Sequence, residues 1–317
     1  MTGITPWHWA AFIVCILFFL ALDLGVFHRR SRVVTFREAL AWSAVWFTLA
    51  MLFAVALFFW RSRPEAVQFT TGYVIELTLS LDNVLVIAVI FNYFHVPEEY
   101  QHRLLFWGIL GVLVMRGAMI AAGVVLITSF SWILYVFGAL LVGAGIKMLF
   151  SQKQVQLEKN LVLRMARKFF SVSENYDGRK FFTRTGRGLT LTPLALALLL
   201  IETTDLLFAI DSVPAVFSVT RDAFIVFTSN VFAILGLRSM YFLLAGALGY
   251  FRYLKIGLAT VLVFIGAKML LDPHGHEPKW FQVELPTSVS LMAVAAILLL
   301  SISLSLTAAH REKKHSP

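Results

Sequence analysis

Nine long runs of apolar residues, separated by short polar segments, constrain the fold of this chain more than any other feature. A helix needs about 20 mostly apolar residues to cross a bilayer, and each run has about that length. Hydrophobic residues make up 59% of the 317 residues and charged residues 14%, whereas soluble domains average about 45–50% and 25%. The sequence therefore predicts an all-α polytopic membrane protein. The predicted spans are residues 7–27, 39–60, 69–93, 104–127, 131–150, 191–218, 223–247, 253–271 and 285–309.

The basic residues predict how the chain is oriented. The 27 Lys and Arg outnumber the 18 Asp and Glu, and most of them lie in alternate loops, which the positive-inside rule places in the cytoplasm. The loop 151–190 holds nine of them, and we expect a short helix around residues 160–170. The N-terminus is then outside and the C-terminus cytoplasmic. We interpret these clusters as topology anchors, and we expect no nucleic-acid partner.

An internal repeat relates the two sides of that loop. Glu76 and Asp82 are six residues apart, as are Asp205 and Asp211, and the residues between them are mostly apolar in both copies. Each copy holds three spans, and because three is odd, the second copy enters the membrane from the opposite side. Such inverted repeats build many secondary transporters, with the substrate site near the midplane. Two basic pairs keep the same order along the repeats: Arg116 with Arg238, and Lys147 with Lys268.

The repeat divides the chain into five predicted parts. Two N-terminal spans occupy residues 1–68, and the first three-helix repeat occupies 69–150. The cytoplasmic loop 151–190 leads to the second repeat at 191–271. An external loop, the last span and a cytoplasmic tail complete the chain at 272–317. The fold is thus predicted to be two inverted three-helix units with flanking helices.

Ionisable residues within the predicted spans point to a cation. Each costs about 2.5–3.5 kcal/mol at a helix centre, so such residues normally line a polar path or pair with one another. Six acids against four bases leave a net negative charge, which a divalent cation would neutralise. The acids are Asp23, Glu76, Asp82, Glu202, Asp205 and Asp211, and the bases are Arg116, Lys147, Arg238 and Lys268.

The acidic segments also present oxygen ligands on common helix faces. At 100° per residue, Asp82 and Asp211 lie about 120° away from the acids six residues before them, so a straight helix would separate them. Pro214 is expected to break its helix beside Asp211 and to free the carbonyl of Ile210. Carboxylate, hydroxyl and amide oxygens suit Mg²⁺, Ca²⁺ or Mn²⁺. The predicted metal ligands are Glu76, Asp82, Asn83, Glu202, Asp205, Asp211 and Ser212, with Ser80, Asn230 and Asp23 as further candidates.

Two interpretations of the intramembrane charges remain open at this stage. The four bases either compensate the carboxylates while no cation is bound, with proton-for-metal exchange as a consequence, or form ion pairs that only fix helix packing. An oxyanion path built on Arg116 and Arg238 is a third option.

Cys15, the single cysteine, excludes dithiol chemistry within the chain. We find no nucleotide-binding or nucleophile motif, and we therefore expect neither enzymatic activity nor a prosthetic group.

Several stretches of the sequence resemble the TerC family of bacterial integral membrane proteins, within the LysE superfamily, and most closely its Alx-type members. The resemblance covers nearly the whole chain and includes two Gly-x-Lys-Met-Leu stretches. The longer stretches are residues 76–84 (ELTLSLDNV), 202–215 (ETTDLLFAIDSVPA), 228–241 (TSNVFAILGLRSMY) and 23–29 (DLGVFHR).

The resemblance implies a multi-span protein of the bacterial inner membrane that exports manganese. By this resemblance, the acidic residues of the family match Asp82, Glu202, Asp205 and Asp211 in this sequence, and Glu76 supports the match. The resemblance also brings an alternative, because the family name comes from tellurium resistance and Alx-type members have been described as redox modulators that respond to alkaline pH. That alternative is a membrane protein for stress resistance or redox and pH response that does not transport. The oligomeric state is not readable from the sequence.

Overall fold

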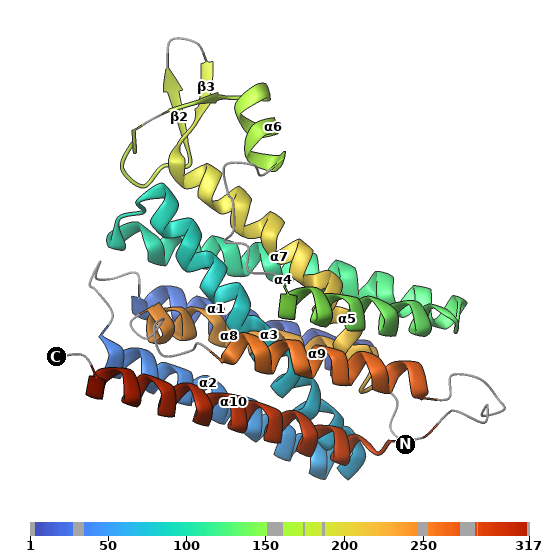
Figure 1. The fold of residues 1–317 in the computed structure, drawn as a ribbon. Helices are drawn as coiled ribbons and strands as arrows, with labels where there is room; N and C mark the ends of the chain where they lie inside the picture. The colour runs from blue at the N-terminus through green and yellow to red at the C-terminus, as the bar shows by residue number, and fades with distance from the viewer. Residues whose placement is uncertain are drawn as a thin grey trace.

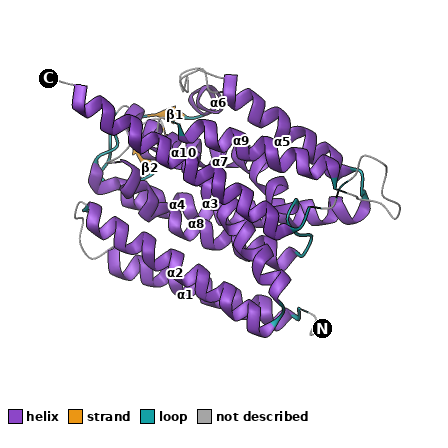
Figure 2. Ribbon diagram, turned by 60° about the horizontal axis from the view of Figure 1, so that its bottom comes forward, coloured by secondary structure: helices purple, strands orange, loops and turns teal. Residues whose placement is uncertain are grey.

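The computed structural model describes residues 4–27, 35–150, 161–173, 175–185, 188–245, 253–272, 283 and 285–315. Within them the chain forms ten α-helices and three short strands (Figures 1 and 2). The elements are α1 (Pro6–Phe27), α2 (Phe36–Trp60), α3 (Arg63–Phe94), α4 (Glu98–Ser129), α5 (Ile133–Phe150), α6 (Leu161–Phe169), β1 (Ser171–Val172), β2 (Phe182–Thr185), β3 (Gly188–Leu191), α7 (Pro193–Phe217), α8 (Ala223–Ala245), α9 (Leu254–Leu271) and α10 (Thr287–His315).

The helices confirm an all-α polytopic membrane protein. Among the described residues, eight helices are long and apolar enough to cross a membrane, namely α2 to α5 and α7 to α10, and α1 adds a shorter apolar helix over Pro6–Ala21. Large apolar side chains face outward from the bundle, including Phe59 and Phe150, which are 82% and 81% exposed. In lipid these side chains are solvated by acyl chains, so their exposure carries no penalty there.

Local sequence fixes where the helices begin and end. Ser62 and Thr192 cap α3 and α7 through their side chains, and each is followed within two residues by a proline in the first helical turn, where its missing N–H is not needed. Asp222 accepts a hydrogen bond from the backbone N–H of Phe224 (2.9 Å) at the start of α8. His95 ends α3 in the left-handed conformation, with φ of 52°. The α3–α4 turn is therefore tight.

The helices pack in an arrangement that crosses between the two predicted repeats. α5 lies against α9, α3 against α8, and α4 against α7. Glycines allow α5 and α9 to approach closely: a Cβ at Gly138 would lie 3.0 Å from the carbonyl oxygen of Gly266, and one at Gly145 would lie 2.8 Å from that of Ala259. In the repeat alignment Gly145 matches Gly266, and Gly138 matches Ala259. The two contacts are therefore reciprocal.

One end of the bundle is marked by the segment α6–β3, which covers the first turn of α7 (Figure 1). Helix α6 is the short helix expected around residues 160–170. The three-stranded sheet is additional to the prediction: β3 pairs in parallel with β1 and antiparallel with β2. Tyr176 donates a hydrogen bond to the carbonyl of Phe94 (2.6 Å), and Arg103 lies over the ring of Phe181, so the segment is fixed to the α3–α4 turn. We call this end the α6 face and the other end the opposite face.

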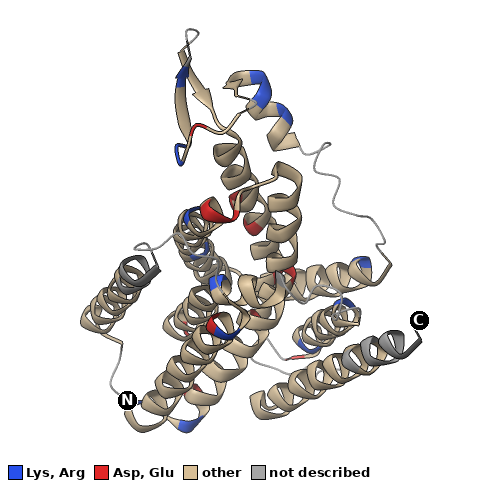
Figure 3. Ribbon diagram, turned by 90° about the vertical axis from the view of Figure 1, so that its left-hand side faces the viewer, with Lys and Arg blue, Asp and Glu red and all other residues tan. Residues whose placement is uncertain are grey.

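Charged residues follow the same division of the molecule. Lys and Arg are frequent on the α6–β3 segment, whereas most of the helical bundle carries no charge (Figure 3). At the opposite face Arg61 pairs with Glu65 and, at 3.2 Å, with Asp222, which ties the end of α2 to the starts of α3 and α8. Few charges remain inside the bundle, and several of them meet around Arg116.

A buried arginine at the centre of four helices

Arg116 of α4 is the centre of a buried polar network. The side chain is 1% exposed and donates to the carboxylate of Glu76 on α3 and to Oδ1 of Asn230 on α8 (3.1 Å). Its Nε and Nη2 donate to the two carboxylate oxygens of Asp205 on α7, both at 3.3 Å. One guanidinium thus joins carboxylates that occupy matching positions in the two predicted repeats.

Two amide side chains orient the network. Asn83 of α3 donates from Nδ2 to Oδ1 of Asp205 (3.1 Å). Asn230 donates from its own Nδ2 to the carbonyl of Val226 (3.0 Å), so its Oδ1 is turned toward Arg116. Glu76 and Asn230 are 0% exposed, and Asn83 and Asp205 are 5% exposed. The charges are thus removed from solvent, where ionic hydrogen bonds are strong.

Glu202 adds a third carboxylate beside the network. It lies one turn before Asp205 on α7 and interacts with it electrostatically. Its Oε2 is buried and has no hydrogen-bond partner among the described residues. The carboxylate lies against Gly111 of α4, at a place where any Cβ would overlap it. Arg116 therefore contacts two carboxylates, those of Glu76 and Asp205, and Glu202 adds a third acidic group next to Asp205.

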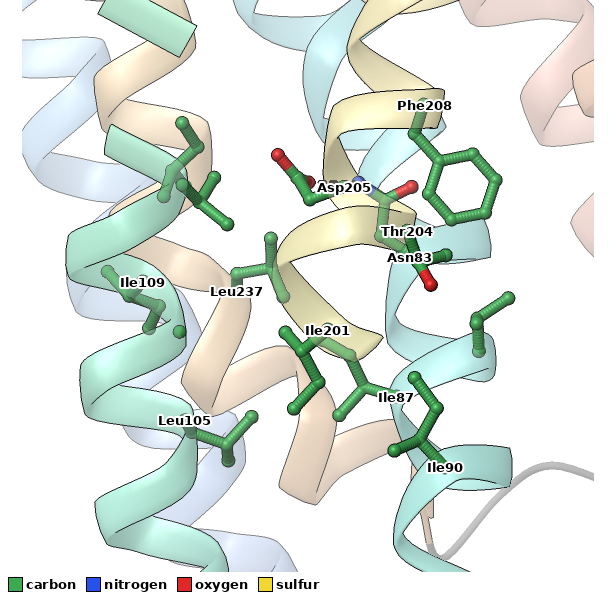
Figure 4. Close-up of a pocket in the computed structure, with 14 residues that line it drawn as sticks. Asn83, Ile87, Ile90, Leu105, Ile109, Ile201, Thr204, Asp205, Phe208 and Leu237 are labelled. Atoms are coloured by element: carbon green, nitrogen blue, oxygen red, sulfur yellow. Dashed lines mark hydrogen bonds between the residues drawn. The ribbon is translucent and has the colours of Figure 1, made fainter. Parts of the chain in front are cut away.

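A small cavity lies between this network and the α6 face. Its volume is about 20 Å³, and it is enclosed by α3, α4, α7 and α8. Asn83, Thr204 and Asp205 are its polar residues, and Figure 4 shows them together at one end, with aliphatic side chains along the rest. The cavity is bounded by the last turns of α3 and the first turns of α4, so it runs from Asp205 toward the α6 face. Its apolar lining includes Ile87, Ile90, Leu105, Ile109, Ile201 and Leu237.

The structure separates two of the predicted ligands from this network. Asp82 and Asp211 are only partly buried, and their charged neighbours are Lys255 of α9 and Lys147 of α5. The expected break at Pro214 is absent: α7 runs through it to Phe217, because a proline so near the helix end removes only one hydrogen bond. Within the described residues, no three His, Cys, Asp or Glu side chains converge to hold a metal ion. The seven predicted ligands therefore do not form one site.

The remaining basic residues lie away from Arg116. Arg238 is near His102, with Nη2 and Nδ1 at 2.9 Å. Lys268 donates to the carbonyl of Ser218 (3.4 Å) and pairs with Asp272 at 3.7 Å near the opposite face. Lys147 is exposed. Of the four predicted charge-compensating residues, Arg116 alone contacts the carboxylates of the network. The side chain of Asp23 lies outside the described residues.

Two features near the network were not apparent from the sequence. Gly111 makes room for Glu202. In the sequence, the one pattern that points to it is a small residue one to two turns before an intramembrane arginine. Lys255 faces Asp82, although it lies at the start of a span and reads as a topology anchor. Two serines at predicted ligand positions, Ser80 and Ser212, are buried with hydroxyls that have no partner among the described residues.

Comparison with known proteins decides the family. The sequence model of the integral membrane protein TerC family matches residues 61–314. The chain belongs to the TerC family. The match begins at the end of α2 and includes every residue of the Arg116 network. In this TerC protein, α1 and α2 therefore lie outside the family match, although they pack against α3 and α8.

Relatives of similar length accompany this TerC protein. It is 49% identical over 316 residues to the "Uncharacterized membrane protein STKORF319" of Myxococcus xanthus, covering 99% of this chain and 95% of the relative. It is 43% identical over 321 residues to the "Putative membrane-bound redox modulator Alx" of Escherichia coli K12, covering 98% and 97%. A membrane protein of Rickettsia bellii is 40% identical over 295 residues, covering 93% and 95%. No solved structure matches the chain.

Proposed function

We propose that this TerC protein is a transporter that exports divalent cations, manganese first among them, through the Arg116 network. The observation that carries the proposal is the position of Asp205. Its carboxylate lines a small cavity on the side of the α6 face and is held there by a single arginine. A permanent ion pair would need no access route.

The charges explain how a cation would displace the arginine. Glu76, Asp205 and Glu202 exceed Arg116 by two negative charges if all are ionised. A divalent cation arriving at Asp205 and Asn83 would balance that excess and compete with the guanidinium for the same oxygens. Arg116 then acts as a tethered counter-charge in the empty transporter, which spares the carboxylates the high cost of unpaired charge in a membrane. Proton exchange at Glu202, whose Oε2 has no partner among the described residues, is the proposed coupling.

The donor atoms support a hard cation. Carboxylate, amide and hydroxyl oxygens suit Mg²⁺, Ca²⁺ and Mn²⁺, whereas thiolate and imidazole ligands suit softer metals. Oxygen ligands alone do not select Mn²⁺, so the choice of manganese rests on the family resemblance. We propose no prosthetic group, no enzymatic turnover and no nucleic-acid partner; the partners are the ion and the bilayer.

The arrangement of the helices supports transport by alternating access. The reciprocal contacts between α5 and α9 are those expected of two inverted repeats around a pseudo-two-fold axis. Following the positive-inside rule, we place the α6 face in the cytoplasm, the N-terminus outside, the C-terminus in the cytoplasm, and the protein in the bacterial inner membrane. The cavity then lies on the cytoplasmic side of the Arg116 network, which is the side from which an exporter collects its substrate.

Reconstituted protein gives the direct test. Proteoliposomes containing an internal Mn²⁺ indicator are compared for wild type, Asp205→Asn and Asp177→Asn, the last changing an aspartate of the α6–β3 segment. We expect at least a tenfold loss of Mn²⁺ flux for Asp205→Asn and less than a twofold change for Asp177→Asn. Unchanged flux in Asp205→Asn would remove the site. A panel of divalent ions at two pH values tests selectivity and proton coupling.

The name of the Alx relatives favours a second candidate, a membrane protein for redox or pH response that does not transport. For this chain, Cys15 is the single cysteine, and it is exposed in the described structure, so a dithiol switch within one chain has no residues to use. This candidate predicts no metal flux from purified wild-type protein and a phenotype that depends on the loop 151–190. The oxyanion option instead predicts greater harm from Arg116→Gln and Arg238→Gln than from the Asp variants.

A further inference from the structure

Besides Glu202 Oε2, three buried oxygens on α3 and α7 have no hydrogen-bond partner among the described residues. They are Glu76 Oε2, Ser80 Oγ and Ser212 Oγ, and their residues are 0%, 0% and 1% exposed. Nearly all buried polar groups in proteins are hydrogen-bonded, so unpaired ones need an explanation. Glu76 and Ser80 are one helical turn apart on α3 and share a face.

The packing of α3 against α7 places Ser212 opposite Glu76. Asn83 contacts Asp205 directly (3.1 Å). On α3, Glu76 lies seven residues before Asn83. On α7, Ser212 lies seven residues after Asp205. A further four residues in each direction lead to Gly72 and Val216, and a Cβ at Gly72 would lie 3.1 Å from Cγ1 of Val216. The antiparallel register therefore holds on both sides of the pair.

Glu76 and Ser212 lie on the side of Asn83 and Asp205 that faces away from the cavity, and Ser80 lies between Glu76 and Asn83 on α3. The cavity is lined by Asn83 and by residues nearer the α6 face, whereas Glu76 and Ser212 are two turns nearer the opposite face. α7 continues from Ser212 to its C-cap Ser218, which lines a crevice of about 450 Å³ at that face. The guanidinium that contacts both Glu76 and Asp205 separates the two positions.

We propose that Glu76, Ser80 and Ser212 form a second cation site on the outward side of Arg116. This inference rests on the proposed function and extends it: a divalent cation bound first at Asp205 and Asn83 passes to the second site when Arg116 moves. Carboxylate and hydroxyl oxygens are ligands for a hard cation, and they would replace water that the ion loses in the narrow space between α3 and α7.

A cysteine at the proposed site gives a test with its own readout. Thiolate favours soft metals, so Ser212→Cys, in a Cys15→Ser background, is expected to make Mn²⁺ flux sensitive to Cd²⁺ at a concentration at least tenfold lower than in the background protein. Ser290→Cys is the matched control, because Ser290 of α10 is also buried with an unpartnered hydroxyl but lies outside α3 and α7. Equal Cd²⁺ sensitivity in the two variants would overturn the second site and leave a water-filled polar gap in its place.

A second variant separates this inference from the proposed function. Ser80→Ala/Ser212→Ala is expected to lower the maximal Mn²⁺ flux at least fivefold and to leave the half-saturating cytoplasmic Mn²⁺ concentration within twofold, because Asp205 and Asn83 are intact. If wild type and Asp205→Asn behave as proposed while this double variant matches wild type in both values, the second site alone is wrong. If purified wild type shows no flux, the proposed function fails first. Thermal unfolding checks that the variants fold.

Discussion

Arg116 and Asp205 form a two-point ion pair between α4 and α7, with both nitrogen–oxygen distances at 3.3 Å. Lysine has a single charged nitrogen and cannot reproduce this fork. The same guanidinium also contacts Glu76, so the one side chain holds together helices from both predicted repeats. Under the proposed function, its position determines both the stability of the empty protein and the access of a cation to the carboxylates.

Removing the arginine is therefore expected to destabilise the bundle. Arg116→Gln leaves two buried carboxylates without their counter-charge, which costs about 3–5 kcal/mol when one partner of a buried pair is lost. We expect a clear fall in the unfolding midpoint in detergent, and little recovery in Arg116→Lys. Neutralising the partners as well, in Arg116→Gln/Glu76→Gln/Asp205→Asn, is expected to restore much of the midpoint. A triple variant less stable than Arg116→Gln alone would contradict this account.

The sequence predicts the helices well because the bilayer imposes a simple length rule on apolar runs. It misses the ends of the longest helices: α4 begins at Glu98, several residues before the predicted residue 104, because its first turns are polar. It also misses strands β1 to β3, whose two to four residues each are too short to show a period. Gly188, at φ of 112°, gives the chain the backbone freedom needed at the start of β3.

The sequence predicted which residues belong to the candidate site, but not which acidic and basic side chains contact each other. Helical geometry already separates Asp82 and Asp211 from the faces of Glu76 and Asp205, and the structure keeps them apart. Which of the four bases meets the carboxylates depends on how each helix is rotated and tilted, and a single sequence does not contain that information. Arg116 and Arg238 match in the repeat alignment, yet only Arg116 contacts the acids, because α4 and α8 are packed differently.

Gly111 is expected to control the position of Glu202. A Cβ at this place would overlap the Glu202 carboxylate, so Gly111→Ala must move that side chain away from α4. We expect at least a fivefold loss of Mn²⁺ flux and a changed pH dependence of transport, measured in proteoliposomes. Gly143→Ala is the control, because nothing lies within 4 Å of a Cβ there. If the two variants transport Mn²⁺ at the same rate, the position of the Glu202 carboxylate against Gly111 has no role in transport.

The contact between α5 and α9 predicts a stability defect of a different kind. A Cβ at Gly266 would approach the backbone of α5, with Gly138 O at 2.7 Å, and backbone does not move aside as a side chain does. Gly266→Ala is therefore expected to separate the two helices and to lower the unfolding midpoint by several degrees. Gly143→Ala again serves as the control on α5. An unchanged midpoint in Gly266→Ala would show that the helices tolerate a wider spacing.

Filling the cavity tests whether it is the route to Asp205. Ile87 lines the cavity below Asn83 (Figure 4), and Ile87→Trp adds bulk to a cavity of only about 20 Å³. In a Cys15→Ser background, we expect Thr204→Cys to react with a membrane-impermeant thiol reagent added on the side of the α6 face, and Ile87→Trp to slow that reaction at least tenfold. The same substitution is expected to abolish Mn²⁺ flux. Ile146→Trp, on a 45% exposed position of α5, controls for the added indole, and equal labelling in both Trp variants would place the route elsewhere.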